Sequence, residues 1–184
     1  IGKNHNVYKS NLQSQLMSIF EVRSNFPLIK KSEKFSEKIT PLVSFRLNPG
    51  QMKNLTSRGV NVDNIFSINR LGLSEAYEKG KSLTLGLNYR KDKNDYSEDA
   101  LDEVEKYFEI KLAGVLRDVE ENKISSSTTL NRKASNLFGS ITNKMSENIQ
   151  IDYNFAIDND LTTFENNDVN IKFSLNNLIT EFNF

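Results

Sequence analysis

The stretch Ile149–Ile157 reads I-Q-I-D-Y-N-F-A-I, with a large apolar residue at every odd position and a polar or small residue at every even one. A repeat of two residues is the signature of a β-strand that has one apolar face and one polar face. The same alternation recurs in Val169–Leu175 and in Leu83–Tyr89. The chain is therefore built from two-faced strands, and its function must be one that such strands can perform.

Seven strands are predicted from this pattern, and an eighth begins near Thr180–Phe184. The seven candidates cover residues 8–23, 39–48, 82–91, 107–117, 129–144, 148–158 and 168–176. The alternation is weakest in 129–144, which we interpret as a strand because Ser146–Asn148 forms a tight hairpin link to the next candidate. Lys30–Lys34 and a long polar region are interpreted as connections. Ser97–Glu105 fits either a short helix, with Ser97 as its cap, or a solvated acidic loop.

Charged residues within the clearest strands all lie on the face opposite the apolar series. They are Glu21, Arg23, Arg46, Arg90, Glu109, Lys111, Arg117, Asp152 and Lys172. A Lys or Arg that faces lipid at mid-bilayer costs about 2–4 kcal/mol, so a membrane barrel must show this segregation. A soluble sheet with one wet face shows it too. The segregation therefore indicates two-faced strands, and it leaves both environments open.

Strand length favours a membrane barrel over a soluble sheet. Strands of soluble proteins centre on about five or six residues, whereas a tilted membrane strand needs about 9–11. Ile149–Ile157, Tyr107–Arg117 and Leu12–Val22 fit the longer class. The polar side chains of such strands would face a lumen, although a merely solvated face is the other interpretation. The lumen-facing candidates are Asn88, Gln150, Asp152, Asn154, Asn170 and Lys172.

The composition argues against several classes of function. Lys and Arg number 24, as do Asp and Glu, so the formal net charge is zero and the basic footprint of a nucleic-acid-binding protein is missing. Without cysteine there is no disulfide, thiolate metal site or cysteine nucleophile. The single histidine, His5, lies in a terminus that we expect to be exposed. We find no phosphate-binding loop, nucleophile elbow or zinc spacing, so we predict no enzyme, catalytic residue, cofactor or metal.

One region resembles a known family. Residues 63–75 read D-N-I-F-S-I-N-R-L-G-L-S-E, and the strand after them reads G-K-S-L-T-L-G-L-N-Y over 80–89. These elements are similar to the C-terminal barrel of LptD, also called OstA or Imp, a family of outer-membrane lipopolysaccharide-assembly proteins. The resemblance covers most of 40–184, and Asn69-Arg70 is its most specific point. Many members have Asn-Arg-Phe-Ser-Gly where this chain continues Leu71-Gly72-Leu73, and the family's periplasmic domain and its cysteines are not in this sequence.

The resemblance implies an all-β fold, an antiparallel up-and-down transmembrane β-barrel segment of about seven to eight strands. Residues 1–184 would be an internal part of one outer-membrane barrel domain, with a long loop at about 48–81. The family delivers lipopolysaccharide to the outer leaflet, receives it from the periplasmic Lpt bridge, and carries an LptE-type lipoprotein inside the barrel. It implies no cofactor. Asn69 and Arg70 form the structural loop motif, in which Arg70 is expected to order the loop by binding carbonyls or a carboxylate.

Three other interpretations of the same residues remain open. A small eight-stranded outer-membrane barrel of structural or porin type would use Phe184 as its C-terminal aromatic residue. A soluble carbohydrate-binding β-sandwich would need shorter strands and a filled core between two sheets. An enzyme would need a convergent cluster of carboxylates or histidine. A section of a larger barrel leaves two open strand edges, so we expect the isolated chain not to fold stably.

Overall fold

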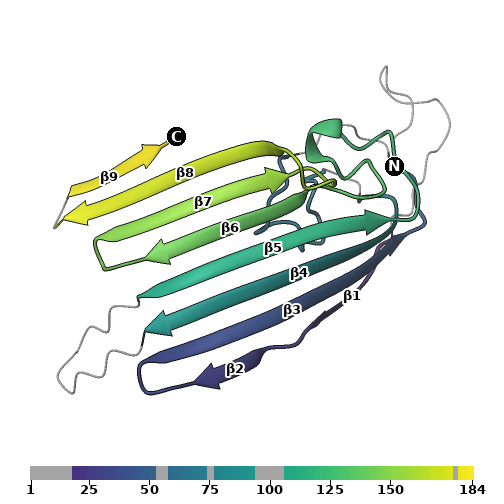
Figure 1. Ribbon diagram of the computed structural model, residues 1–184. Helices are drawn as coiled ribbons and strands as arrows, with labels where there is room; N and C mark the ends of the chain where they lie inside the picture. The colour runs from purple at the N-terminus through teal and green to yellow at the C-terminus, as the bar shows by residue number, and fades with distance from the viewer. Residues whose placement is uncertain (1–17, 53–57, 74–76, 94–105, 176–177) are drawn as a thin grey trace, which may run out of the picture.

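A computed structural model describes residues 18–52, 58–73, 77–93, 106–175 and 178–184. These residues form one antiparallel sheet of nine strands (Figure 1). The strands are β1 (Phe20–Asn25), β2 (Leu28–Lys31), β3 (Phe35–Asn48), β4 (Gly80–Lys93), β5 (Tyr107–Arg117), β6 (Leu137–Lys144), β7 (Ile149–Ile157), β8 (Phe164–Leu175) and β9 (Leu178–Asn183). A single 3-10 turn, η1 (Ser126–Thr128), is the only helical element in these ranges. No helix in the described residues has the length and apolar character needed to cross a membrane.

The expected fold class, all-β and antiparallel, is confirmed. From β3 onward each strand pairs with the next one along the chain, which is the up-and-down order of a β-barrel segment. Among the described residues the sheet is not closed, since β1 and β2 form one edge and β9 forms the other. The sheet has nine strands in the described residues, whereas seven or eight were expected. A β-sandwich would place a second sheet against the first, whereas the part of the chain described here forms one sheet.

Five of the nine strands, β3, β4, β5, β7 and β8, have nine or more residues and match the longer class, whereas β1, β2, β6 and β9 are shorter. The bounds of β5 agree with the predicted segment 107–117, and β7 is one residue shorter at each end than the predicted 148–158. β3 and β4 each span 14 residues. Such lengths exceed the five or six residues common in soluble sheets. The predicted helix or acidic loop at 97–105, and residues 8–17 of the first strand candidate, lie outside the described residues.

The candidate strand 129–144 was wrong in its first half. β6 begins only at Leu137, and the preceding residues form a loop. Thr129 has a positive φ of 56°, which is incompatible with a strand, and Leu130 is fully buried. Beside β5, the Val115 backbone N–H donates to Ser135 Oγ at 2.9 Å. A side chain thus replaces the backbone partner that a longer strand would supply.

The segment Lys30–Lys34 was wrongly interpreted as only a connection. Its first residues belong to β2, which pairs with the early part of β3, and β3 itself begins at Phe35. β1 and β2 run along the same side of β3 and are separated at Phe26-Pro27. The Phe26 N–H donates to the Pro41 carbonyl at 3.1 Å, but Pro41 has no N–H to return the bond. The edge strand is therefore interrupted opposite this proline.

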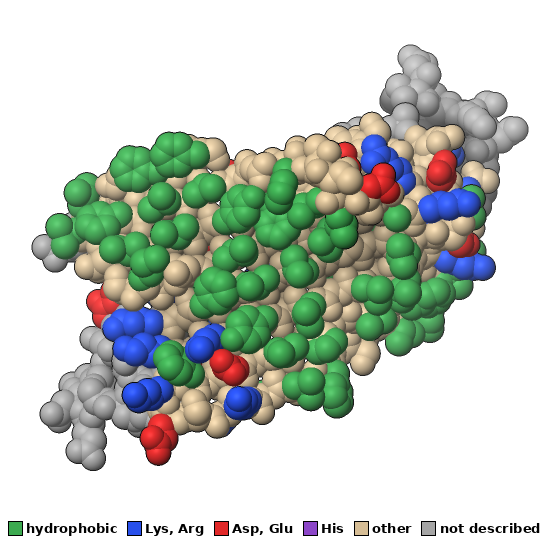
Figure 2. All heavy atoms as spheres, viewed as in Figure 1, with side chains coloured by type: hydrophobic (Ala, Val, Ile, Leu, Met, Phe, Trp, Pro, Cys, Tyr) green, Lys and Arg blue, Asp and Glu red, His purple; other side chains and the backbone are tan. Residues whose placement is uncertain are grey.

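Register places the polar and apolar residues on opposite faces of the sheet. Neighbouring partners across the strands include Glu21 with Arg46 and Arg90 with Glu109. By the same register, all nine charged residues singled out from the sequence share one face. Figure 2 shows the other face, where apolar side chains extend over the sheet and charged side chains gather toward its two ends.

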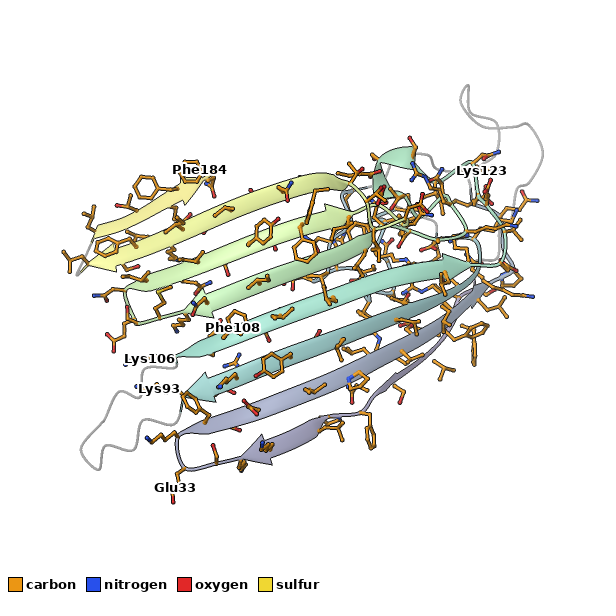
Figure 3. The ribbon with its side chains drawn as sticks, in the orientation of Figure 1. Glu33, Lys93, Lys106, Phe108, Lys123 and Phe184 are labelled. Atoms are coloured by element: carbon orange, nitrogen blue, oxygen red, sulfur yellow. The ribbon has the colours of Figure 1, made fainter. Side chains whose placement is uncertain are left out.

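The ends of the sheet differ in the length of their connections. One end carries the connections 32–34, 94–106, 145–148 and 176–177, whereas the two longest connections lie at the other end. The other end carries the connections 49–79, 118–136 and 158–163. Figure 3 shows Glu33, Lys93 and Lys106 at the first end, whereas Lys123 lies at the second. On the apolar face, charged side chains thus lie mainly where the strands end.

Replacement of Gly139 by Val tests the apolar face. The Phe155 ring of β7 lies over Gly139 of β6, and a Cβ atom at Gly139 would overlap that ring. We expect the substitution to destabilise the protein by about 1–3 kcal/mol, as overpacking does. The midpoint of heat-induced unfolding of the full-length protein in detergent measures the loss. Gly59→Ala is the control, because a Cβ there meets nothing within 4 Å. Equal midpoints for the two variants would contradict this packing.

Candidate functional site

Residues 58–73 of the long β3–β4 connection fold back onto the polar face of β3, β4 and β5. The Arg46 Nη2 atom donates to the Ser67 carbonyl at 2.9 Å, and Lys111 Nζ lies 3.0 Å from Asp63 Oδ1. The Phe66 ring rests on Gly86, where an added Cβ would lie only 2.7 Å from Phe66 Cζ. This segment therefore covers part of the face that the sequence predicts to be polar and open.

A small apolar core lies between the sheet and its connections at this end. It consists of Met52, Val62, Ile65, Leu71 and Leu73 from the β3–β4 connection, Ile124 and Leu130 from the β5–β6 connection, and Ala113, Val115, Phe138 and Ala156 from the strands. The strand members are mostly small, which lets the connections approach the sheet closely. The core holds both long connections against the same face.

Arg70 lies at the centre of the contact between the segment and the sheet. Its side chain is fully buried, and it binds Glu78 in a two-pronged fork with Nε–Oε2 and Nη2–Oε1 distances both of 2.6 Å. Arg70 also donates to Thr84 Oγ1 at 2.9 Å and to Ser82 Oγ at 3.1 Å on β4. A planar guanidinium with five donors suits this set of acceptors, and a lysine ammonium could not reproduce the fork.

The sheet provides a row of polar residues directly beneath the fork. Register aligns Glu21, Arg46, Ser82 and Arg117 across β1, β3, β4 and β5. Arg117 Nη1 donates to Glu78 Oε1, and Arg46 Nη1 lies 3.5 Å from Glu78 Oε2. The carboxylate of Glu78 is thus surrounded by three guanidinium groups that come from three separate parts of the chain.

The electrostatics of the cluster keep Glu78 ionised. Burial by itself would raise the pKa of the Glu78 carboxyl, but the opposing effects of Arg70, Arg117 and Arg46 are together greater. The pKa of Glu78 therefore lies below its ordinary value of 4.5. Arg46 is also buried, and its Nε and Nη1 atoms have no hydrogen-bond partner. The arrangement depends on every charge being present, because an unpaired buried charge is costly.

Asn69 shapes the turn that follows Arg70. Its side-chain amide donates to the Leu73 carbonyl at 2.9 Å, and its Oδ1 accepts from the Leu73 backbone N–H at 3.0 Å. Gly72 has a φ of 64°, a left-handed conformation that favours glycine. The departure Leu71-Gly72-Leu73 from the usual family sequence is therefore compatible with a tight turn, and both leucines are buried in the small core.

The six lumen-facing candidates share the polar face but fall into two groups. Asn88 pairs with Lys111 on the part of the sheet beside the docked segment. The other five, Gln150, Asp152, Asn154, Asn170 and Lys172, lie on β7 and β8. Asp152 accepts hydrogen bonds from Thr142 Oγ1 at 2.7 Å and from Gln150 Nε2 at 2.8 Å. This second group is partly exposed and rich in amides, unlike the buried charges around Arg70.

The cluster around Glu78 was not predicted from the sequence. Arg46 and Arg117 were noted only as charges on the polar parity, and Glu78 was not singled out. A local signal was present in the eight-residue spacing of Arg70 and Glu78 before a strand, but the two strand arginines are remote in sequence. In the described residues, no group of three or more His, Cys, Asp or Glu side chains is arranged to hold a metal ion.

Comparison with known proteins gives one match over nearly the whole chain. A family model described as LptD, LPS transport system D, matches residues 2–183. No curated protein is similar enough to match.

Replacing Glu78 by Gln is expected to destabilise the docked segment strongly. The substitution leaves three guanidinium groups without their shared carboxylate, and breaking a buried pair costs about 3–5 kcal/mol. Thermal unfolding of the full-length protein, with limited proteolysis of residues 58–73, measures the effect. Arg70→Lys should fail to restore the fork.

The matched control is Glu181→Gln on β9. Its ion pair with Lys172 is 3.5 Å long and both side chains are about half exposed, so its loss should change stability by no more than about 1 kcal/mol. An equal loss of stability in the two glutamate variants would contradict the expectation that the buried Glu78 cluster contributes more to stability than an exposed ion pair.

Acid should release the segment from the sheet. A carboxyl with a lowered folded-state pKa stabilises the fold at pH values above its ordinary value of 4.5, and the stabilisation is lost as pH falls through the lowered pKa. A spin label in place of the exposed Ile68 should become mobile as the pH is lowered below 4.5 and through the lowered pKa of Glu78. Asp63→Asn should leave the transition in place, whereas a label that stays immobile at low pH would contradict the role of Glu78.

Proposed function

We propose a function from the premise that this chain belongs to the LptD family, the LPS transport system D proteins. LptD proteins are outer-membrane components of lipopolysaccharide transport. The finer proposal is that the chain forms part of the translocon that delivers lipopolysaccharide to the outer leaflet. In it, residues 1–184 belong to one barrel domain, and further strands complete the barrel.

The observation that carries this proposal is the separation of the two faces along long strands. Large apolar side chains such as Phe45, Leu87 and Phe173 are about 40% exposed on one face. In water such a surface would be costly, whereas hydrocarbon accepts it at no cost. The opposite face carries the charges and amides. A barrel with this arrangement offers lipid an apolar wall and offers a sugar chain a hydrated interior.

We assign different roles to the two parts of the polar face. Residues 58–73, anchored through Asn69 and Arg70, fill the space above β3–β5. The amides of β7 and β8, including Asn154 and Asn170, remain accessible and supply hydrogen bonds to the sugar portion of lipopolysaccharide. An LptE-type lipoprotein inside the barrel and a periplasmic bridge that delivers lipopolysaccharide are the partners that the family assignment favours.

Transport of this kind makes and breaks no covalent bond, so we propose that the chain is not an enzyme and needs no cofactor. The work of the barrel is to separate environments. The acyl chains move beside the apolar wall, and the sugars move through the hydrated interior. Amides serve this role better than charges, because they exchange partners readily and do not retain a phosphate.

Site-specific photocrosslinking at two neighbouring residues tests the proposal. A benzophenone residue in place of Asn170, on the polar face, should capture lipopolysaccharide in transit in cells that make the full-length protein. The same residue in place of Val169 points to the apolar face and should capture membrane lipid instead. Both native side chains have intermediate exposure, so the positions are matched.

Interruption of the periplasmic bridge supplies the second arm. Capture at position 170 should then disappear, because no lipopolysaccharide enters the barrel, whereas capture at position 169 should be unchanged. Normal arrival of lipopolysaccharide at the cell surface without any capture at 170 would overturn the proposed route along β7 and β8.

A further inference from the structure

A groove of about 310 Å³ opens on the apolar face where β5 and β6 separate. Its walls are mainly hydrocarbon, and the leucines that line it come from four parts of the chain: Leu85, Leu116, Leu137 and Leu161. Leu85 and Leu116 are each nearly half exposed although they lie side by side with other strand residues. The groove is continuous with the apolar face seen in Figure 2. A second hollow of about 350 Å³ on that face lies at the other end of the sheet, and it differs in being lined by four lysines, Lys91, Lys93, Lys106 and Lys144.

The groove follows from a mismatch in strand length. β5 continues to Arg117, but β6 begins at Leu137, so the pairing of the two strands ends at Ala113 with Phe138. Beyond it β5 meets the β5–β6 connection, through the bridge between Leu116 and Ala134 and backbone hydrogen bonds to Lys133 and Ser135. Gly114 forms the floor and has no side chain to fill it. A Cβ at Gly114 would have the Asn136 carbonyl oxygen, 3.7 Å away, as its nearest neighbour, so a side chain is sterically allowed there. The hollow therefore depends on this glycine.

A rigid turn places Leu161 at the edge of the groove. Leu161 has a φ of 58°, which is uncommon for a residue with a branched side chain, and it is 65% exposed. The Asp158 carboxylate fixes this turn by accepting the backbone N–H groups of Thr162 at 2.7 Å and Thr163 at 3.2 Å. A strained backbone that holds an apolar side chain out of the fold is a feature that a bound apolar ligand would explain.

We propose that this groove holds one acyl chain of a lipopolysaccharide molecule in the outer leaflet. The inference rests on the proposed function for its membrane setting. In outer-membrane barrels the short turns face the periplasm and the longer loops face the cell surface. The groove lies at the end that carries the two longest connections, 49–79 and 118–136, and we assign this end to the cell surface. The lipid of that leaflet is lipopolysaccharide, and an apolar hollow with few polar atoms accepts its hydrocarbon rather than its sugars.

Crosslinking in intact outer membranes tests the occupant. A benzophenone residue in place of Leu161, in the full-length protein, should capture lipopolysaccharide through an acyl chain, as mass spectrometry of the adduct would show. The matched position is Ile39, which is 42% exposed on the same face. It lies near the start of β3, toward the end of the sheet away from the groove. There the adduct should contain phospholipid. Phospholipid alone at position 161, or no adduct, would overturn the proposal.

Filling the groove provides the second measurement. Gly114→Leu, combined with the benzophenone at position 161, should abolish most of the lipopolysaccharide adduct, whereas Gly114→Ala should retain it. Heat-modifiable gel mobility confirms that each variant is folded, and the comparison of positions 161 and 39 stands even if the leucine variant is not. Undiminished capture in a folded Gly114→Leu protein would overturn the proposal.

The result is distinguishable from a failure of the proposed transport route. Lipopolysaccharide already present in the outer leaflet supplies the groove, so the adduct at position 161 should persist after the periplasmic bridge is interrupted. The adduct at position 170 should be lost under the same condition. Loss of both adducts together would overturn the assignment of the groove to resident outer-leaflet lipid.

Discussion

The register of the strands is the constraint on which the rest of this structure depends. Side chains alternate between the faces, so a shift of one residue between two strands would carry a whole row to the wrong face. The observed register aligns Glu21, Arg46, Ser82 and Arg117 beneath Glu78. It also collects the exposed apolar residues on the other side. Both the charged cluster and the apolar surface are consequences of one set of backbone hydrogen bonds.

The cluster around Glu78 explains how a polar connection can be held against a sheet. Apolar side chains of residues 58–73 supply one part of the contact, through Ile65, Leu71 and their neighbours in the small core. The charged cluster supplies the other part. Arg70 joins the segment to Glu78 and to β4, while Arg46 and Arg117 approach the same carboxylate from β3 and β5. A buried charge without partners is costly, so the segment has one stable position above the sheet.

The two ends and two halves of the sheet differ in ways that suit transport of an amphipathic molecule. Above β3–β5 the polar face is covered by packed connections, and over β7 and β8 it presents partly exposed amides. On the apolar face, the short β6 leaves a hollow floored by Gly114 at the end with longer connections. In the proposed barrel, the exposed amides over β7 and β8 would contact the sugar, and the hollow on the apolar face would contact the hydrocarbon.

The sequence by itself determined the two-faced strands, their antiparallel class and, through Asn69-Arg70, the family, because alternation and a local motif are properties of contiguous residues. That alternation alone gives the bounds of β5, and it gives those of β7 to within one residue at each end. Only the tertiary structure decided that Arg46 and Arg117 meet Glu78, that β6 begins at Leu137, and that residues 58–73 cover part of the polar face. These features depend on contacts between residues far apart in the chain. Periodicity tells which face a side chain occupies, but it does not tell which remote residue will cover it.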